Sequence, residues 1–284
     1  MIRNILKISD LNVTFRGSNE KFTAVDNFSL EIKKGETIAI VGESGSGKST
    51  TALSILGLLP YPIAHHNKGS IKFKNTELLN ADSKKLQKYR GSKIGMIFQE
   101  PMMSLNPLHT VNKQIQESIL IHNKTPLNML KKRVLELINL VGLNDSEKYL
   151  YSYPHQLSGG QRQRVMIAIA IANNPDLLIA DEPTTALDVT IQIQILQLLK
   201  KIQKKLGMSI LLITHDLGIV KFMAKNVYIM YRAKLVEFGK VKNVLSAPQN
   251  IYTKKLINAQ PVDLKRKKNF KPGKLILSIE NIKV

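Results

Sequence analysis

The segment GESGSGKST at residues 42–50 limits the possible folds of this chain more than any other feature of the sequence. It follows the apolar run ETIAIVG (36–42), which is typical of a buried strand, and it leads into a helical pattern. The segment fits G-x-x-x-x-G-K-[ST] in the strand-to-helix context that this pattern requires. Its glycines let the backbone wrap round phosphates, so that consecutive N–H groups and the helix N-terminus point at them. The sequence therefore predicts an α/β fold with a nucleotide-binding loop.

Within this loop, we expect Lys48 to reach the β- and γ-phosphates and the hydroxyl of Ser49 to ligate Mg²⁺. A chance Gly/Ser turn is the alternative, but the strand, the helix and the Lys-Ser pair are all present. The residues predicted to hold the nucleotide here are Gly42, Ser44, Gly45, Ser46, Gly47, Lys48, Ser49 and Thr50.

Buried apolar runs alternate with helical patterns along much of the chain, which favours a parallel sheet covered by helices. The predicted strands are 5–15, 24–32, 36–42, 94–98, 176–181 and the run SILLIT from residue 209. Long helices are predicted at 161–172 and 188–206. Helical spacing from about 110 to 150 interrupts the alternation and indicates an inserted helical subdomain. The pair His65-His66 is placed in a loop, and the histidines other than His215 are interpreted as surface residues.

Polar side chains follow three of the predicted strands, at the ends where ligands bind in open α/β sheets. Asp181 is expected to hold Mg²⁺, directly or through water, and Gln99 to complete its shell and sense the γ-phosphate. Glu182 is placed to act as the general base for the attacking water. His215 is placed to hold the γ-phosphate and orient that water. Paired acids at a strand end are often simply polar, and a lone His after a strand is more often structural.

A second glycine-rich helix start, LSGGQ, occupies residues 157–161. Its glycines and Ser158 also form an anion-seeking site, yet the first loop already cradles the nucleotide of this chain. We therefore predict that Ser158, Gly159, Gly160 and Gln161 contact the γ-phosphate of a nucleotide held by a second copy, in a head-to-tail dimer with two composite sites.

Composition narrows the class of protein further. The chain has no cysteine, which excludes disulfides and thiolate metal sites and fits a reducing compartment. Neither a signal peptide nor an apolar run of membrane-spanning length is present in the sequence, so we expect a soluble, cytosolic protein. The formal net charge of +21 could reflect nucleic acid, an anionic membrane face, or lysines spread over a solvated surface. The dispersion of the lysines favours the third interpretation.

Taken together, the motifs resemble the ATP-binding cassette (ABC) ATPases over residues 5–260. They occur in the family order: GESGSGKST as Walker A, Gln99 as the Q-loop, LSGGQ as the signature, LLIADE (177–182) as Walker B, TALD (185–188) as the D-loop and His215 as the switch histidine. The resemblance implies a P-loop NTPase with a helical subdomain at about 105–165 and an N-terminal antiparallel β subdomain. It implies ATP and Mg²⁺ as cofactors and places Asp188 in the nucleotide site. Phe15 either stacks on adenine or is a core residue of an early strand.

Finer segments resemble the dipeptide/oligopeptide importer branch, notably FQEPMMSLNP (98–107) and APQNIYTKKLI (247–257). This resemblance implies an ATPase subunit on the cytoplasmic face of the inner membrane that energises import of peptides or peptide-like solutes. Its partners would be permease subunits that bind near Gln99–Pro107, a second cassette and, indirectly, a solute-binding protein, with no nucleic acid. The Cys-rich C-terminal stretch of many members is absent. The alternative is a soluble, non-transport ABC ATPase that acts on ribosomes or nucleic acid.

The C-terminal part predicts a further unit. A basic linker at 261–273 contains KRKK (265–268), and the final segment (274–284) contains LILSIENIKV, which echoes ILKISDLNV at 5–13. The echo indicates the first strand of a second, missing cassette and resembles the first half of YejF-type tandem-cassette (microcin C/peptide) ATPases. A strand that completes the sheet of the first domain is the alternative.

Overall fold

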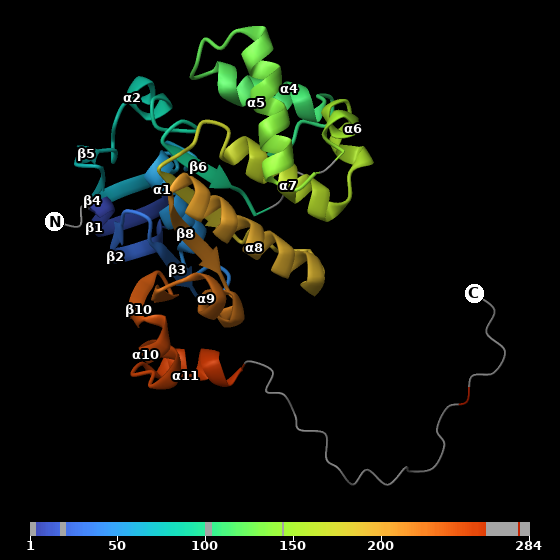
Figure 1. Cartoon of the computed structure of the whole chain (residues 1–284). Coiled ribbons are helices and arrows are strands. Elements are labelled where there is room, and N and C mark those ends of the chain that lie inside the picture. Colours follow the sequence, from blue (N-terminus) through green and yellow to red (C-terminus); the bar gives the residue numbers. More distant parts are fainter. Residues whose placement is uncertain (1–3, 18–20, 100–103, 144, 260–277, 279–284) are drawn as a thin grey trace.

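The computed structural model describes residues 4–17, 21–99, 104–143, 145–259 and 278. Ten strands of this part of the chain form one sheet, in the order β5-β4-β1-β2-β10-β9-β3-β8-β7-β6 (Figure 1). The strands are β1 (Asn4–Arg16), β2 (Lys21–Lys33), β3 (Thr37–Val41), β4 (Ala64–Phe73), β5 (Thr76–Glu77), β6 (Ile94–Ile97), β7 (Leu177–Asp181), β8 (Ser209–Thr214), β9 (Asn226–Tyr231) and β10 (Lys234–Lys240).

One half of the sheet is parallel and buried on both faces. β3 pairs in parallel with β9 and β8, and the run continues in parallel through β7 to β6. Every residue of β3, β7 and β8 is buried, which explains their unbroken apolar sequences. Ile38 and Ile40 of β3 pack in one hydrophobic cluster, whereas Ala39 and Val41 pack in a second cluster on the opposite face. The predicted parallel sheet is confirmed.

β10 ends the first half, antiparallel to β9 and next to β2. The other half is antiparallel and consists of β1, β2, β4 and β5. It confirms the predicted N-terminal antiparallel β subdomain, and β1 and β2 include the predicted strands at 5–15 and 24–32. The loop predicted for His65-His66 is wrong, because both residues lie on β4 and pair with Thr14 and Val13 of β1. The partner strand determines this element, and its polar local sequence gave no sign of it.

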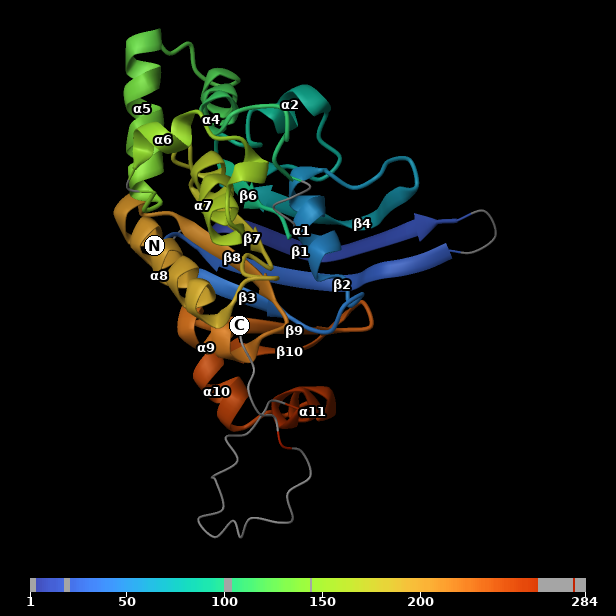
Figure 2. The ribbon, with the colours of Figure 1, turned by 90° about the vertical axis from the view of Figure 1, so that its right-hand side faces the viewer.

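Helices cover the sheet on both sides, and α4 to α7 lie together beside the β6 edge (Figures 1 and 2). The helices are α1 (Lys48–Leu56), α2 (Ser83–Gln87), α4 (Val111–Leu120), α5 (Leu127–Leu140), α6 (Ser146–Leu150), α7 (Gly159–Ala170), α8 (Val189–Leu206), α9 (Leu217–Met223), α10 (Val241–Ser246) and α11 (Ile251–Asn258), with a 3₁₀ turn η1 at Pro154–Gln156. The helical periodicity predicted from about 110 to 150 is thus confirmed. The subdomain boundaries remain a prediction.

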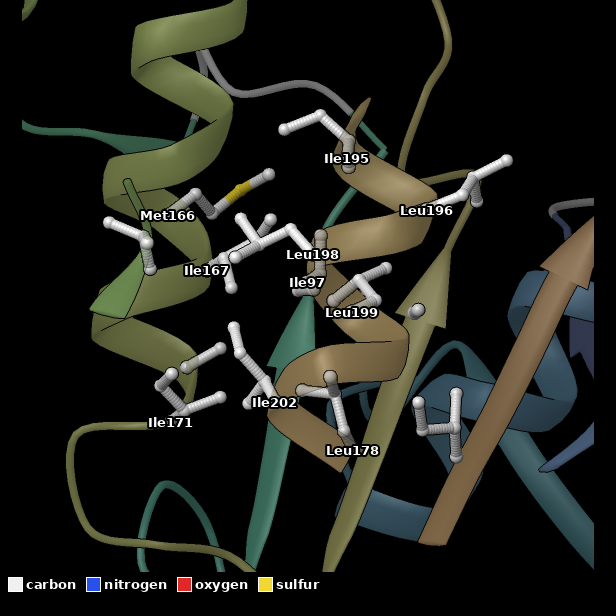
Figure 3. Packing of buried hydrophobic residues seen from close by; sticks show 14 of the residues in the cluster. Ile97, Met166, Ile167, Ile171, Leu178, Ile195, Leu196, Leu198, Leu199 and Ile202 are labelled. Carbon is white, nitrogen blue, oxygen red and sulfur yellow. The ribbon is translucent and has the colours of Figure 1, made fainter. Parts of the chain in front are cut away.

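α7 and α8 attach the helical region to the parallel sheet through one hydrophobic cluster (Figure 3). Ile167 of α7 and Ile195 and Leu199 of α8 point toward one another and toward β6 and β7. All three side chains are fully buried, and so is Ile97 of β6. α7 begins at the predicted site residue Gly159, and α8 begins directly after the predicted site residue Asp188.

The structure leaves the predicted C-terminal strand untested. The segments 260–277 and 279–284 lie outside the described residues, so the basic linker and the first strand of a second cassette remain predictions. Within the described ranges, no helix is both long and apolar enough to cross a membrane.

Candidate nucleotide-binding site

The predicted site residues gather where four parallel strands end. The sheet order β3-β8-β7-β6 makes these strands neighbours, and the pairs Val41–Thr214, Asp181–Ile213 and Ile97–Ala180 put their carboxyl ends in line. The glycine-rich loop, His215, Glu182 and Gln99 follow those ends. Ligands of open α/β sheets bind at this edge.

The glycine-rich loop depends on two glycines that allow no side chain. A Cβ on Gly42 would collide with the carbonyl oxygen of Met230 on β9. Gly47 has a φ of 100°, and a Cβ there would collide with the carbonyl oxygen of Ala24 on β2. The loop is therefore pressed against two strands while its N–H groups lead into α1, the arrangement that binds phosphates at a helix start.

Lys48 is 5% exposed and lies inside the loop. Its Nζ donates to the carbonyl oxygens of Gly42 and Glu43, each at 2.8 Å. Burial lowers the pKa of Lys48, while the nearby carboxylates of Glu182 and Asp181 oppose that shift. The ammonium group is thus held by two neutral acceptors that it can exchange for phosphate oxygens.

Asp181 is 5% exposed at the end of β7, and its Oδ1 has no hydrogen-bond partner within the described part of the chain. Burial raises the pKa of Asp181, and the Glu182 charge adds to the rise, while a hydrogen bond from Ser49 and the charge of Lys48 lower it. A buried, unpaired carboxylate oxygen beside a serine hydroxyl is an oxygen donor set of the kind that Mg²⁺ prefers. These residues therefore fit the predicted Mg²⁺. No cluster of three or more His, Cys, Asp or Glu side chains suited to a metal occurs among the described residues.

Three side chains surround the carboxylate of Glu182. Gln99 donates through Nε2 to Oε2 at 3.2 Å, and Thr185 donates through Oγ1 to the same oxygen at 2.9 Å. Nδ1 of His215 lies 3.3 Å from Oε1. Glu182 itself has a φ of 45°, in the left-handed region, and its N–H bonds to the carbonyl of Ile213. The turn aims the carboxylate toward the ends of β6 and β8, which is how three distant segments meet at one side chain.

The signature segment begins α7. The hydroxyl of Ser158 accepts from the N–H of Gln161 at 3.4 Å, and Oε1 of Gln161 accepts from the N–H of Ser158 at 2.9 Å. Nε2 of Gln161 also donates to the hydroxyl of Tyr149. A Cβ on Gly160 would clash with Ile191 of α8. Ser158 and Gly159 are exposed, so the helix start is accessible from outside.

The remaining predicted residues are not joined to the loop. Asp188 caps α8 by accepting from the N–H of Ile191 at 2.9 Å. Phe15 is partly exposed on β1 and packs against a hydrophobic cluster, which leaves the adenine and core interpretations both open. Within the described residues, no hydrogen bond or ion pair connects Asp188, Phe15 or residues 158–161 to residues 42–50. Their contact with a nucleotide remains a prediction.

Sequence reasoning missed two residues of this region. Thr185 contacts Glu182, and its place three residues after Glu182, at the start of TALD, was the available signal. Tyr252 of α11 contacts the glycine-rich loop itself, as its hydroxyl accepts from the N–H of Glu43 at 3.1 Å. Tyr252 lies in the segment 247–257 that resembles the importer branch, but nothing in that segment indicates a contact with the loop, which lies 209 residues earlier in the chain.

A loop pressed against the sheet, a buried lysine and a strand-end carboxylate pair define a P-loop nucleotide-binding protein of the α/β class. Comparison with known proteins makes this more specific. The family model described as "ABC transporter" matches residues 25–185. The chain belongs to the ABC transporter family, which confirms the resemblance drawn from its motifs.

Two relatives and one solved structure illustrate the similarity. The peptidoglycan transport ATP-binding protein YejF of Agrobacterium fabrum is 52% identical over 257 residues, covering 90% of this chain and 47% of that protein. The oligopeptide transport ATP-binding protein OppD of Bacillus subtilis is 47% identical over 260 residues, covering 92% of this chain and 73% of that protein. The dimeric post-hydrolysis structure of the ATP-binding cassette MJ0796 with ADP and Pi aligns with a TM-score of 0.74 and 33% identity, over 83% of this chain and 98% of that one. The chain thus spans less than half the length of the YejF relative.

Proposed function

We propose that this chain is the ATP-hydrolysing, nucleotide-binding subunit of an ABC importer for peptides or peptide-like solutes. The observation that carries the proposal is the arrangement round Glu182, whose carboxylate is contacted by Gln99, Thr185 and His215 at the strand ends beside the phosphate loop. Such an arrangement can remove a proton from water next to a bound γ-phosphate.

In this mechanism, the loop N–H groups and Lys48 bind the phosphates. Ser49 and Asp181 would hold Mg²⁺, which supplies charge neutralisation at the β- and γ-phosphates. Glu182 accepts a proton from water as the water oxygen bonds to the γ-phosphorus and the bond to ADP breaks. His215 and Gln99 orient Glu182 and the water. A cavity of about 210 Å³ lies beside Glu182 and His215 and has room for water.

We place the signature segment in a head-to-tail dimer, where Ser158 and the glycines that follow it contact the nucleotide of the other copy. Support comes from the exposed start of α7. It also comes from the similar cassette MJ0796, whose solved structure is described as dimeric. Each nucleotide would then lie between two chains, so that ATP binding closes the dimer and hydrolysis opens it.

The permease would bind in a groove of about 940 Å³. Exposed apolar side chains line it from three segments: Leu58 after α1, Phe98 after β6 and Ile121 after α4. The groove lies next to the predicted contact region Gln99–Pro107, of which residues 100–103 are outside the described structure. An apolar groove of this kind suits a short amphipathic helix of a membrane subunit.

The proposed solute and the proposed cellular location rest on the descriptions of related proteins. Those cited are described as transport ATP-binding proteins for peptidoglycan and for oligopeptides. We infer a peptide or peptide-like solute delivered by a solute-binding protein, and a peripheral position on the cytoplasmic membrane face. Copurification of the full chain with integral membrane proteins in detergent supports the importer, whereas copurification with nucleic acid contradicts it.

The variant Glu182→Gln tests the proposed ATP hydrolysis. Loss of the general base should lower kcat for ATP by about 100-fold or more, while the Kd for ATP stays close to that of the wild type. Glu147→Gln, which removes an exposed carboxylate on α6, is the matched control and should turn over ATP normally. Wild-type turnover by Glu182→Gln would remove Glu182 from the mechanism.

A further inference from the structure

The amide of Glu43, the second residue of the phosphate loop, is bound by a residue near the far end of the described chain. The N–H of Glu43 donates to the hydroxyl of Tyr252 on α11 at 3.1 Å. Glu43 is the residue directly after Gly42, at the point where β3 turns into the loop. The contact therefore acts where the loop changes direction.

Tyr252 is itself held firmly. Its side chain is 9% exposed, and its ring stacks on that of Tyr231 with centroids 4.1 Å apart and an interplanar angle of 24°. Tyr231 follows Met230, whose carbonyl oxygen lies against Gly42. The end of β9 and the start of α11 thus form one support under the first two residues of the loop.

The start of α11 is fixed by hydrogen bonds that do not involve the loop. Asn250 caps the helix by accepting from the N–H of Tyr252 at 2.8 Å. Glu237 on β10 accepts from the N–H groups of Gln249 and Asn250 at 2.9 and 3.0 Å. Because β10 carries this end of α11, the Tyr252 hydroxyl is presented to the loop by rigid elements.

The other side of the same segment is held by Lys48, which donates to the carbonyl oxygens of Gly42 and Glu43. A nucleotide would draw the Lys48 ammonium toward its phosphates and weaken those two bonds. The bond from Glu43 to Tyr252 does not involve the Lys48 ammonium, so we expect it to remain.

We propose that Tyr252 is a positioning residue, which keeps the phosphate loop in its nucleotide-binding shape before the nucleotide arrives. The inference rests on the proposed function, because it assumes that the loop binds ATP. Tyr252 touches no reacting atom, so its contribution belongs to binding and not to the chemical step.

The test is Tyr252→Phe in the full chain, which keeps the ring stack and removes the hydroxyl. The Kd and the KM for ATP should rise about tenfold, a typical effect of losing one hydrogen bond, while kcat stays within about twofold. Tyr228→Phe is the matched control. The Tyr228 hydroxyl also accepts a backbone N–H, from Glu31 at 3.5 Å, and its ring also stacks, on Phe238, but it serves β2 and not the loop. Its ATP affinity should equal that of the wild type.

The outcomes separate this inference from the function on which it rests. A wild-type chain that binds no ATP refutes the proposed function. A wild-type chain that binds ATP, together with an unchanged Kd in Tyr252→Phe or an equal loss in Tyr228→Phe, refutes the positioning role. A fall in kcat at constant KM also refutes it. Hydrogen exchange of the Glu43 amide in the wild type gives an independent measurement, and an unprotected amide would overturn the proposal even if the variant failed to fold.

Discussion

At the scale of single residues, the site contains ionisable side chains that are buried although burial disfavours their charged forms. Asp181 and Lys48 are each 5% exposed, and burial alone disfavours the charged form of both. The sequence predicted both residues, because a phosphate loop and a strand-end acid are local patterns. It did not predict Thr185, although Thr185 lies only three residues from its partner Glu182. It could not predict the role of Tyr252, because that contact forms only when segments 209 residues apart meet.

Asp181 gives a prediction about pH. Its pKa is raised in the folded protein, so folding favours the protonated acid, and the ionised form at neutral pH lowers the free energy of unfolding. Asp181→Asn should therefore stabilise the nucleotide-free protein at pH 7. The advantage should shrink as the pH falls through the raised pKa of Asp181 and vanish below the unfolded value of about 3.9. Chemical denaturation at several pH values measures this, and a variant less stable than wild type at pH 7 would contradict it.

At the scale of elements, some helices and strands are predictable from the local sequence pattern, whereas others form only by pairing with distant strands. The buried strands β3, β7 and β8 and the helices α4 to α8 were predictable, because apolar runs and helical periodicity are local signals. β4 was not, since its polar sequence becomes a strand only through pairing with β1. At the start of α7, the Ser158–Gln161 pair forms a capping box, which the sequence analysis did not predict.

The start of α7 can be tested without disturbing the helix. Ser158→Asp keeps an N-cap oxygen, because Asp and Ser cap helices equally well. It also adds a negative charge where we place the γ-phosphate of the partner's nucleotide. Thermal stability and monomer affinity for ATP should stay unchanged, while turnover falls about 100-fold, as on loss of a transition-state donor. Ser158→Thr, which keeps the hydroxyl and adds no charge, is the control and should retain most turnover. If affinity and turnover fell together, the role of Ser158 in a second copy's site would be wrong.

At the scale of the whole molecule, the order of motifs predicted the family, and the family is shown by comparison. The number of copies at work was not predictable, because the sequence does not tell whether the proposed second cassette is another copy of this chain or a different one. Glu182→Gln should trap the closed state. Its mass in solution should change from monomer to dimer only with ATP and Mg²⁺, measured by light scattering after gel filtration. A monomer that binds ATP under all conditions would contradict the pairing of this chain with itself.

The two halves of the sheet meet at a short pairing between β2 and β10, called the seam below. One register pair joins these strands, Lys234 opposite Asp26, with a backbone bond from Asp26 to Ala233. Beneath the seam, the rings of Phe28 and Tyr228 lie 6.3 Å apart between centroids, and a shared hydrophobic cluster continues below both halves. Packed side chains, more than a backbone ladder, therefore hold the halves together. Because hydrophobic packing weakens on cooling, we expect the contact between the two halves of the sheet to weaken in the cold.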